Sequence, residues 1–199
     1  MARRLSPDAR RAEIIEVAHA TIAKEGYRGL SLRELARRCG MSAPGLMHYF
    51  PDMPTLLEAV LAHRDEVDIV AIIGGADTGE DHRSVAELID AAAAYYAQRL
   101  AEIRQFDTLE AEALDPNHPA HAWFTERNQR NLELIRPAVE REFDDPDTVM
   151  KLLRYLFDGL RLSWMRSPDD IDFTADWAAV RSLLDRGLPG RRASPHLVG

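Results

Sequence analysis

The chain has few of the features that mark secreted and membrane proteins. Its 199 residues include a single cysteine, Cys39, so no disulfide can form within the chain. No apolar run approaches the roughly 18–20 residues that span a membrane. The first residues, MARRLSPDARRAEII, are basic but lack the apolar segment of a signal peptide. These absences favour a soluble, cytoplasmic protein without a membrane partner.

The sequence also lacks the short motifs by which many enzymes are recognised. It has no G-x-S-x-G nucleophile motif and no glycine-rich phosphate loop, and it indicates no cofactor. His118 and His121 have a spacing that could share a metal ion, with Glu110, Glu112 and Asp115 nearby. Such a pair more often lies at the surface or caps a helix, so we predict no metal site.

Strand signals are missing as well, because β-branched and aromatic residues nowhere alternate with polar ones over the length of a strand. Helical spacing of apolar residues instead predicts an all-α protein of about nine helices. We expect a loop at 74–81, and we expect Pro137 to kink or divide the helix that contains it. The predicted helices cover about residues 7–25, 31–39, 42–50, 52–73, 83–104, 106–114, 119–143, 147–166 and 174–187.

Charge is unevenly placed along the chain. The net charge is -8, yet residues 1–50 contain nine Lys and Arg against five Asp and Glu, a local net charge of +4. The rest of the chain then carries -12. A basic N-terminal quarter on an acidic protein indicates a local surface for a polyanion, although a solvated charged face gives the same count.

The stretch SLRELARRCGMSAPGLMHYF, from Ser31 to Phe50, predicts two short helices in immediate succession. Ser31 and Glu34 have the spacing of a capping box at the start of the first helix. Gly40 suits the turn because it can adopt a left-handed conformation, and Met41 follows as an apolar plug. The residues of the first helix expected to face inward are Leu32, Leu35, Ala36 and Cys39.

The second of these helices presents an unusual outer face. Ser42 can cap it, and Leu46 and Phe50 bury its inner face. Small residues at its start permit close approach to a DNA major groove, as in a helix-turn-helix, with an ordinary helical hairpin as the alternative. The outward residues are Ala43, Pro44, Gly45, Met47, His48 and Tyr49.

Residues 10–61, RRAEIIEVAHATIAKEGYRGLSLRELARRCGMSAPGLMHYFPDMPTLLEAVL, resemble the DNA-binding domain of the tetracycline-repressor (TetR) family of transcriptional regulators. The matching features are EGYRGLSLRELA, CGMS, and L-x-x-YF followed by LLEAVL. The rest of the chain is similar only in length and helical layout. The resemblance implies a three-helix DNA-binding domain over 1–52 and a helical ligand-binding and dimerisation domain over 53–188. Residues 189–199 are expected to be a disordered tail.

The resemblance also implies which residues meet DNA. In the family the second helix of the motif reads the groove, and an early arginine of the first helix, here Arg33, can reach a base. The family usually has Tyr at Met47 and Lys at Met53, both phosphate contacts that are absent here. Because Pro44 and Gly45 offer little base readout beyond contact with thymine methyl groups, DNA shape is expected to contribute more to recognition. The expected DNA-binding residues are Arg10, Arg11, Arg28, Ser31, Arg33, Arg37, Ser42, Ala43, Pro44, Gly45, Met47, His48 and Tyr49.

The later helices are rich in bulky apolar residues, which form either plain core or functional surfaces. By resemblance, the middle region holds a small-molecule cavity, and candidate lining residues are Val67, Val70, Tyr95, Tyr96, Phe106, Trp123 and Phe124. The last two helices pair with those of a second copy in the family. Candidate dimer residues are Leu153, Leu156, Gly159, Leu160, Trp164, Val180 and Leu184.

Together these features predict a homodimeric, ligand-responsive transcriptional regulator. It is expected to bind a palindromic operator in double-stranded DNA and, as a repressor, to be released by a small, mainly apolar molecule. Two alternatives stay open at this point, a helical enzyme and a DNA-binding protein with no ligand.

Overall fold

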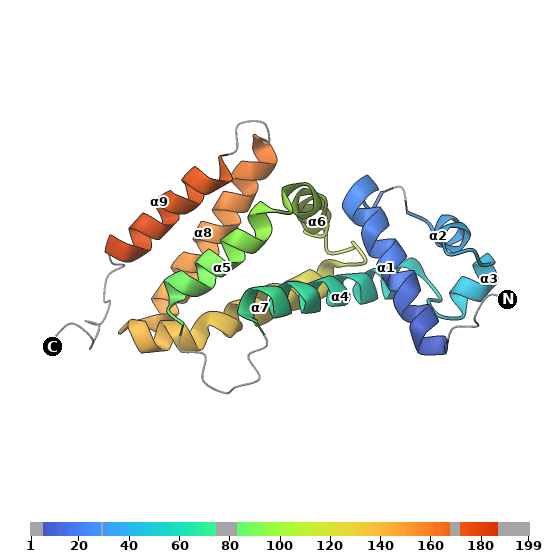
Figure 1. Cartoon of the computed structure of the whole chain (residues 1–199), viewed down its shortest axis with the longest axis horizontal. Coiled ribbons are helices and arrows are strands. Elements are labelled where there is room, and N and C mark those ends of the chain that lie inside the picture. The colour runs from blue at the N-terminus through green and yellow to red at the C-terminus, as the bar shows by residue number, and fades with distance from the viewer. Residues whose placement is uncertain (1–5, 29, 75–82, 168–171, 187–199) are drawn as a thin grey trace. The chain divides into compact units, whose positions relative to one another are not determined.

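The computed structural model describes residues 6–28, 30–74, 83–167 and 172–186. Within these residues the chain forms nine α-helices, labelled in Figure 1, which confirms the predicted all-α class. They are α1 (Pro7–Glu25), α2 (Leu32–Arg38), α3 (Ala43–Met47), α4 (Met53–Ile73), α5 (Val85–Ala97), α6 (Leu100–Glu112), α7 (His121–Glu142), α8 (Pro146–Arg166) and α9 (Phe173–Arg186). None of the described helices is long and apolar enough to cross a membrane.

The helices group into two compact units. Unit 1 comprises residues 1–69 and 100–125, and unit 2 comprises residues 70–99 and 126–199. Their borders fall inside α4 and α7 and between α5 and α6. This division concerns packing, whereas the predicted division at residue 52 concerns function and stays a prediction.

Local capping explains where several helices begin and end. Ser6 precedes α1 and accepts a hydrogen bond from the Ala9 N–H at 3.2 Å, while Gly26 ends that helix with a φ of 80°. Asp52 accepts from the Thr55 N–H at 2.8 Å at the start of α4. These side chains satisfy backbone groups that a helix end leaves without partners, and the predicted limits of α1 and α4 are confirmed.

The helix predicted over 83–104 is in fact two helices. α5 ends at Ala97, Gln98 and Arg99 form the break, and α6 runs from Leu100 to Glu112, so the predicted break near residue 105 was wrong. No glycine or proline marks this point. The break coincides with the border between the two units, because α6 buries Phe106 in unit 1 whereas α5 buries Ile89 in unit 2.

Two other predictions concern breaks in the helical pattern. α7 runs from His121 to Glu142 as one helix with Pro137 inside it, so the proline does not divide the helix. Of the loop predicted at 74–81, only Gly74 belongs to the described residues, and it adopts a φ of 66°. The expected tail at 189–199 lies outside the described residues.

Each unit has its own hydrophobic core. In unit 1, α1 packs against α2 and α6, and α2 packs against α3. In unit 2, α5 packs against α9. The buried residues that hold α2 and α3 in unit 1 include Ile14, Ala18, Ile22, Leu35, Leu46, Phe50, Leu57 and Val60, and those of unit 2 include Val85, Ile89, Val139, Phe143, Val149 and Leu153.

Candidate DNA-binding surface

The turn between α2 and α3 has the geometry that its sequence predicts. Gly40 adopts a φ of 64°, a left-handed conformation that residues with a Cβ atom disfavour. The Met41 N–H reaches back to the Ala36 carbonyl at 2.9 Å, and the Met41 side chain packs against the core of unit 1. Ser42 then caps α3 by accepting from the Gly45 N–H at 3.2 Å. The result is a tight turn between two short helices.

α3 is shorter than predicted and ends at Met47 rather than near Phe50. Leu46 and Phe50 are fully buried, as expected. The opposite face is open, since Pro44, Met47 and His48 are exposed and Ala43, Gly45 and Tyr49 are partly exposed. The His48 and Tyr49 rings lie edge to face, with centroids 5.6 Å apart. Small residues therefore stand at the start of this face and hydrogen-bonding side chains at its end.

The capping box predicted at the start of α2 is only half formed. Ser31 accepts a hydrogen bond from the Glu34 N–H at 3.2 Å. The Glu34 carboxylate turns to two arginines instead of the Ser31 N–H, so the reciprocal bond was predicted wrongly. It accepts from Arg37 at 2.9 and 2.7 Å and from Arg38 at 2.9 Å. The charged guanidinium groups are stronger partners for a carboxylate than a backbone amide.

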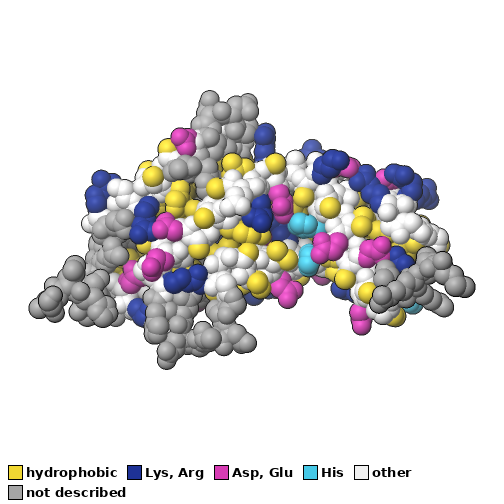
Figure 2. Space-filling view, viewed as in Figure 1, with side chains coloured by type: hydrophobic (Ala, Val, Ile, Leu, Met, Phe, Trp, Pro, Cys, Tyr) yellow, Lys and Arg dark blue, Asp and Glu magenta, His cyan; other side chains and the backbone are white. Residues whose placement is uncertain are grey.

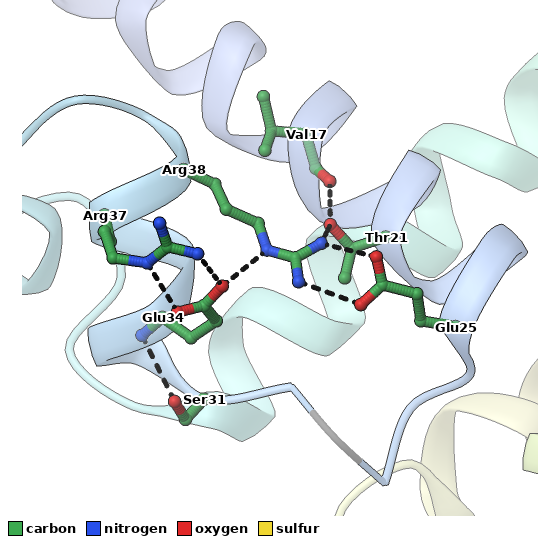
Figure 3. Close-up of polar contacts among 7 residues, drawn as sticks. All are labelled: Val17, Thr21, Glu25, Ser31, Glu34, Arg37 and Arg38. Carbon is green, nitrogen blue, oxygen red and sulfur yellow. Dashed lines mark hydrogen bonds and ion pairs between the residues drawn. The ribbon is translucent and has the colours of Figure 1, made fainter.

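Arg38 joins α2 to α1, as Figure 3 shows. Its two terminal nitrogens donate to the two Glu25 oxygens, each at 2.8 Å, and one of them also reaches the Thr21 hydroxyl at 3.3 Å. The Thr21 hydroxyl in turn donates to the Val17 carbonyl at 2.7 Å. Glu34 lies four residues before Arg38 on the same helix, whereas Glu25 lies in another helix, so the spacing of the sequence does not indicate the pair with Glu25.

These ion pairs shift the acidity of both carboxyl groups. Hydrogen bonds from Arg37 and Arg38 lower the pKa of Glu34 to about 2. The hydrogen bonds from Arg38 likewise lower the pKa of Glu25 below its ordinary value of 4.5. Both groups are therefore ionised at neutral pH, and each cancels positive charge on the surface of unit 1.

Much of the positive charge near the helix-turn-helix is thus neutralised within the chain. Arg10 pairs with Glu13, Arg28 with Glu112 of α6, Arg37 with Glu34, and Arg38 with Glu25. Figure 2 shows the same mixture, with Lys and Arg side chains over the α2 part of unit 1 and carboxylates between them. Three of these carboxylates lie within residues 1–50 and are already subtracted in the local net charge of +4, so only the pair with Glu112 lowers that value. The other pairs determine which arginines stay open to a polyanion.

Two of the predicted DNA-binding arginines have no acidic partner among the described residues. Arg11 is exposed, and its guanidinium carbon lies 4.8 Å from the centre of the Phe50 ring. Arg33 is exposed at the start of α2, and it makes no hydrogen bond or ion pair with any described residue. Its role as a DNA contact stays a prediction.

The residues predicted to line a ligand cavity are spread over both units. In unit 1, Phe106 and Phe124 belong to the core, Trp123 packs against it, and Val67 is exposed. The Phe106 ring is stacked on His19 at 5.4 Å and lies 4.2 Å from the Arg64 guanidinium carbon.

In unit 2, Val70 is exposed, and the partly buried Tyr95 and Tyr96 rings lie 5.3 Å apart. The Arg99 guanidinium lies over the Tyr95 ring at 4.0 Å. Protein side chains thus already occupy ring faces of Phe106 and Tyr95, and a role of any of these residues in ligand binding stays a prediction.

The predicted dimer residues lie mainly on the inner face of α8. Leu153 and Val180 are buried in the core of unit 2, and Leu156 and Leu160 pack against it. The Trp164 indole N–H donates to Asp176 at 2.9 Å, and the Leu184 side chain lies outside the described residues. Gly159 is exposed, and a Cβ atom there would meet nothing within 4 Å.

A second apolar face of α8 points away from the core of unit 2. Leu152 is 41% exposed, Tyr155 67% and Leu162 46%, and Gly159 lies among them at helical spacing. Leu183 of α9 is also exposed, at 46%. Of the residues on this face, the sequence analysis predicted only Gly159 as a dimer residue, because α8 is apolar on two sides and its pattern does not say which side the chain itself covers.

The two histidines of the possible metal pair shape the loop before α7. His118 Nδ1 accepts from the Ala120 N–H at 3.2 Å, and His121 Nδ1 lies 2.8 Å from the Ala113 carbonyl oxygen. Tyr27 meets the His118 ring edge to face at 5.7 Å. In the described part of the chain, no three His, Cys, Asp or Glu side chains are arranged to hold a metal ion.

Comparison with known proteins identifies the helix-turn-helix. Residues 14–60 match the family model for bacterial regulatory proteins of the tetR family. Over 56 residues, 28% of this chain, the sequence is 38% identical to the HTH-type transcriptional regulator BetI of Paraburkholderia phymatum. The alignment covers 29% of that relative, so this likeness concerns the DNA-binding segment alone.

Two solved structures share the fold of the whole chain. A transcriptional regulator from Rhodococcus sp. Rha1 has a TM-score of 0.74 at 18% identity, over 93% of this chain and 99% of that one. The multidrug binding protein EbrR, complexed with imidazole, has a TM-score of 0.65 at 21% identity, over 91% of this chain and 97% of that one. At such identities the likeness shows the fold and not the ligand.

Proposed function

We propose that the chain is a ligand-responsive repressor of the tetR family of bacterial regulatory proteins and not an enzyme, because residues 14–60 match the model of that family. In this proposal a homodimer in the cytoplasm binds a palindromic operator and leaves it when a small, mainly apolar molecule binds. The observation that carries the proposal is Arg33, which is exposed on α2 and has no partner among the described residues, while α2 packs against α3 with its open face.

The proposed DNA contact places the start of α3 at the base edges. Pro44 and the small Ala43 and Gly45 permit close approach, and Pro44 and Ala43 can meet thymine methyl groups. Arg33 supplies a bidentate donor for a guanine edge, while Ser31, Ser42, His48 and Tyr49 reach phosphates. The paired Arg10, Arg28 and Arg37 rank below Arg33 as contacts, because a phosphate must compete with a carboxylate that already holds each of them.

A dimer is proposed to form through the outer face of α8 and α9. Leu152, Tyr155, Gly159 and Leu162 give α8 an apolar stripe that its own unit leaves uncovered, and Leu183 adds to it from α9. Burial of such a stripe against its symmetry mate is favourable, and Gly159 permits close helix approach. Two linked copies would then read two half-sites about one helical turn apart, or a multiple of that spacing.

The proposed effector rests on analogy. EbrR has this fold and is a multidrug binding protein, which supports a small-molecule site in the helical region after α3. The aromatic residues of that region favour a mainly apolar ligand with a few polar anchors. If the ligand releases DNA, linkage requires that DNA weaken ligand binding by the same factor. Calorimetry with and without operator tests this, and equal affinities would show that the ligand is not an inducer.

The DNA-binding proposal is tested by selecting duplexes from a random library with the wild-type protein. We expect a palindromic sequence to be enriched, and we expect Arg33→Ala to weaken binding to it by about 1–3 kcal/mol. Lys24→Ala, an exposed basic residue of α1, is the matched control and should have a smaller effect. Failure to enrich any sequence would refute the proposal, and equal losses on selected and random DNA would make Arg33 a phosphate contact only.

A further inference from the structure

Two of the three arginines of α2 share its exposed face. Arg33 and Arg37 are four residues apart, which places them one helical turn from each other, and both are exposed. A polyanion that meets Arg33 therefore lies within reach of Arg37. Their electrostatic states differ, since Arg33 has no partner among the described residues whereas Arg37 is held at both Glu34 carboxylate oxygens.

Glu34 binds two arginines, which differ in exposure and in the number of their other acidic partners. Arg38 is 28% exposed at its side chain and keeps both oxygens of Glu25 in addition to Glu34. Arg37 is 74% exposed, and Glu34 is its only acidic partner among the residues that the structure describes. Loss of the Glu34 charge would therefore free Arg37 while Arg38 stayed tied to α1 (Figure 3).

We propose that Glu34 limits the number of DNA phosphates that α2 neutralises, by cancelling the charge of Arg37 beside Arg33. The proposal rests on the DNA binding proposed above. The effect of Glu34 on the net charge does not depend on Arg37 staying in one rotamer. If Arg37 turned toward a phosphate, the Glu34 carboxylate would remain close by on the same helix, and the pair would still add no net positive charge. Glu34 thus acts on DNA through Arg37 and is a positioning residue.

The physical consequence is that phosphate contacts, which do not depend on DNA sequence, contribute less to binding relative to contacts with base edges. Each neutralised phosphate releases counterions and steepens the dependence of log K on log salt concentration by about 0.9 on duplex DNA, whatever the sequence. By withholding one such contact in each protomer, Glu34 lowers affinity for all DNA alike. Contacts to base edges, which distinguish an operator from other DNA, are unaffected.

The test measures the salt dependence of binding to a short mixed-sequence duplex, between about 0.05 and 0.2 M salt. Glu34→Gln keeps the side-chain shape and the backbone bond to Ser31. We expect its slope to be steeper than that of the wild type by about 0.9 per protomer, with a severalfold gain in affinity near the lower salt concentration. Arg37→Gln alone leaves the Glu34 charge uncancelled beside Arg33 and should weaken binding. The double variant removes both charges of the pair and should return to the wild-type slope.

Glu66→Gln is the matched control. It removes an exposed carboxylate of α4 and leaves the whole network of α2 in place, so its slope should equal that of the wild type. A folded Glu34→Gln protein with an unchanged or shallower slope would overturn the proposal. So would an Arg37→Gln protein that bound the duplex as tightly as the wild type. This variant leaves the Arg38 bonds intact and is informative even if Glu34→Gln fails to fold.

The wild-type measurement separates this inference from the proposed function. If the wild-type protein bound no duplex at any of these salt concentrations, DNA binding itself would be refuted. If it bound, and the slopes of wild type and Glu34→Gln were equal, only the role of Glu34 would be refuted.

Discussion

Arg38 of α2 and Glu25, the last residue of α1, form a double hydrogen-bonded ion pair with both N–O distances at 2.8 Å. The pair spans the connection between the two helices, of which Ser31 caps the second. Since Arg38, the last residue of α2, also binds Glu34 and Thr21, its guanidinium ties α2 to the last turns of α1. Arg38 therefore belongs to the scaffold that presents α2 and α3.

Arg38→Lys should lower the melting temperature of the protein and weaken its binding to DNA. A lysine ammonium cannot make two parallel bonds to Glu25 and still reach Glu34, so the planar geometry is lost although the charge remains. Circular dichroism on heating measures the effect. Arg37→Lys on the exposed side of the same helix is the control and should melt like the wild type. Equal melting temperatures for all three proteins would show that the Arg38 network adds no stability.

The same network predicts a loss of stability in acid. The pKa of Glu34 is lowered from 4.5 to about 2 in the folded protein, so its ion pairs stabilise the fold fully above about pH 4.5. As the pH falls from 4.5 to 2, protonation favours the unfolded chain and this contribution disappears. Glu34→Gln should make the free energy of unfolding less dependent on pH in that range.

Denaturant titrations at several pH values provide the measurement for this acid effect. Glu66→Gln, at an exposed position of α4, is the control for removing a carboxylate elsewhere in unit 1. If Glu34→Gln and Glu66→Gln changed the pH dependence to the same extent, the ion pairs of Glu34 would have no special role in acid stability.

Leu35→Ala should destabilise unit 1 by about 2–5 kcal/mol. Leu35 is fully buried in the core between α1, α2 and the later helices, so the smaller side chain leaves a cavity. Chemical denaturation measures the change. Leu114→Ala is the control, because Leu114 is 77% exposed and its removal should stay within about 0.5 kcal/mol. Comparable losses for both variants would contradict the assigned core.

Cys39 offers a local probe of the same region. It is 7% exposed, and burial raises the pKa of its thiol, so little reactive thiolate is present at neutral pH. Alkylation by iodoacetamide should be slow in the native protein and fast in denaturant. It should be faster in Leu35→Ala than in wild type, because α2 opens more often. Rapid labelling of the native wild-type protein would place Cys39 outside the core.

Tyr155→Arg should shift the proposed dimer toward monomer. Tyr155 is 67% exposed on the outer face of α8, so an arginine there need not disturb the core, yet it would be costly to bury in a dimer interface. Sedimentation velocity measures the assembly state. Leu114→Arg, which also replaces an exposed apolar residue by arginine, should leave it unchanged. A dimer that persists in Tyr155→Arg would place the interface elsewhere.

Local chemistry in the sequence determined most helix limits and the helix-turn-helix itself. Ser6 and Gly26 bracket α1, Ser31 and Ser42 cap α2 and α3, and Gly40 makes the turn. Caps and tight turns depend on residues a few positions apart, so the sequence contains all the information that they need.

Tertiary structure decided the features that depend on distant partners. The break after α5 arises because α5 and α6 pack in different units. Leu153 faces the core of unit 2, whereas Leu152, one position earlier, is exposed. Because α8 is apolar on two sides, its sequence does not determine which of the two leucines is buried. Arg28 is held by Glu112, far along the chain, while Arg33 has no partner in the part of the chain that the structure describes. Which charge remains available to DNA therefore depends on where folding places the carboxylates, and sequence distance does not encode that placement.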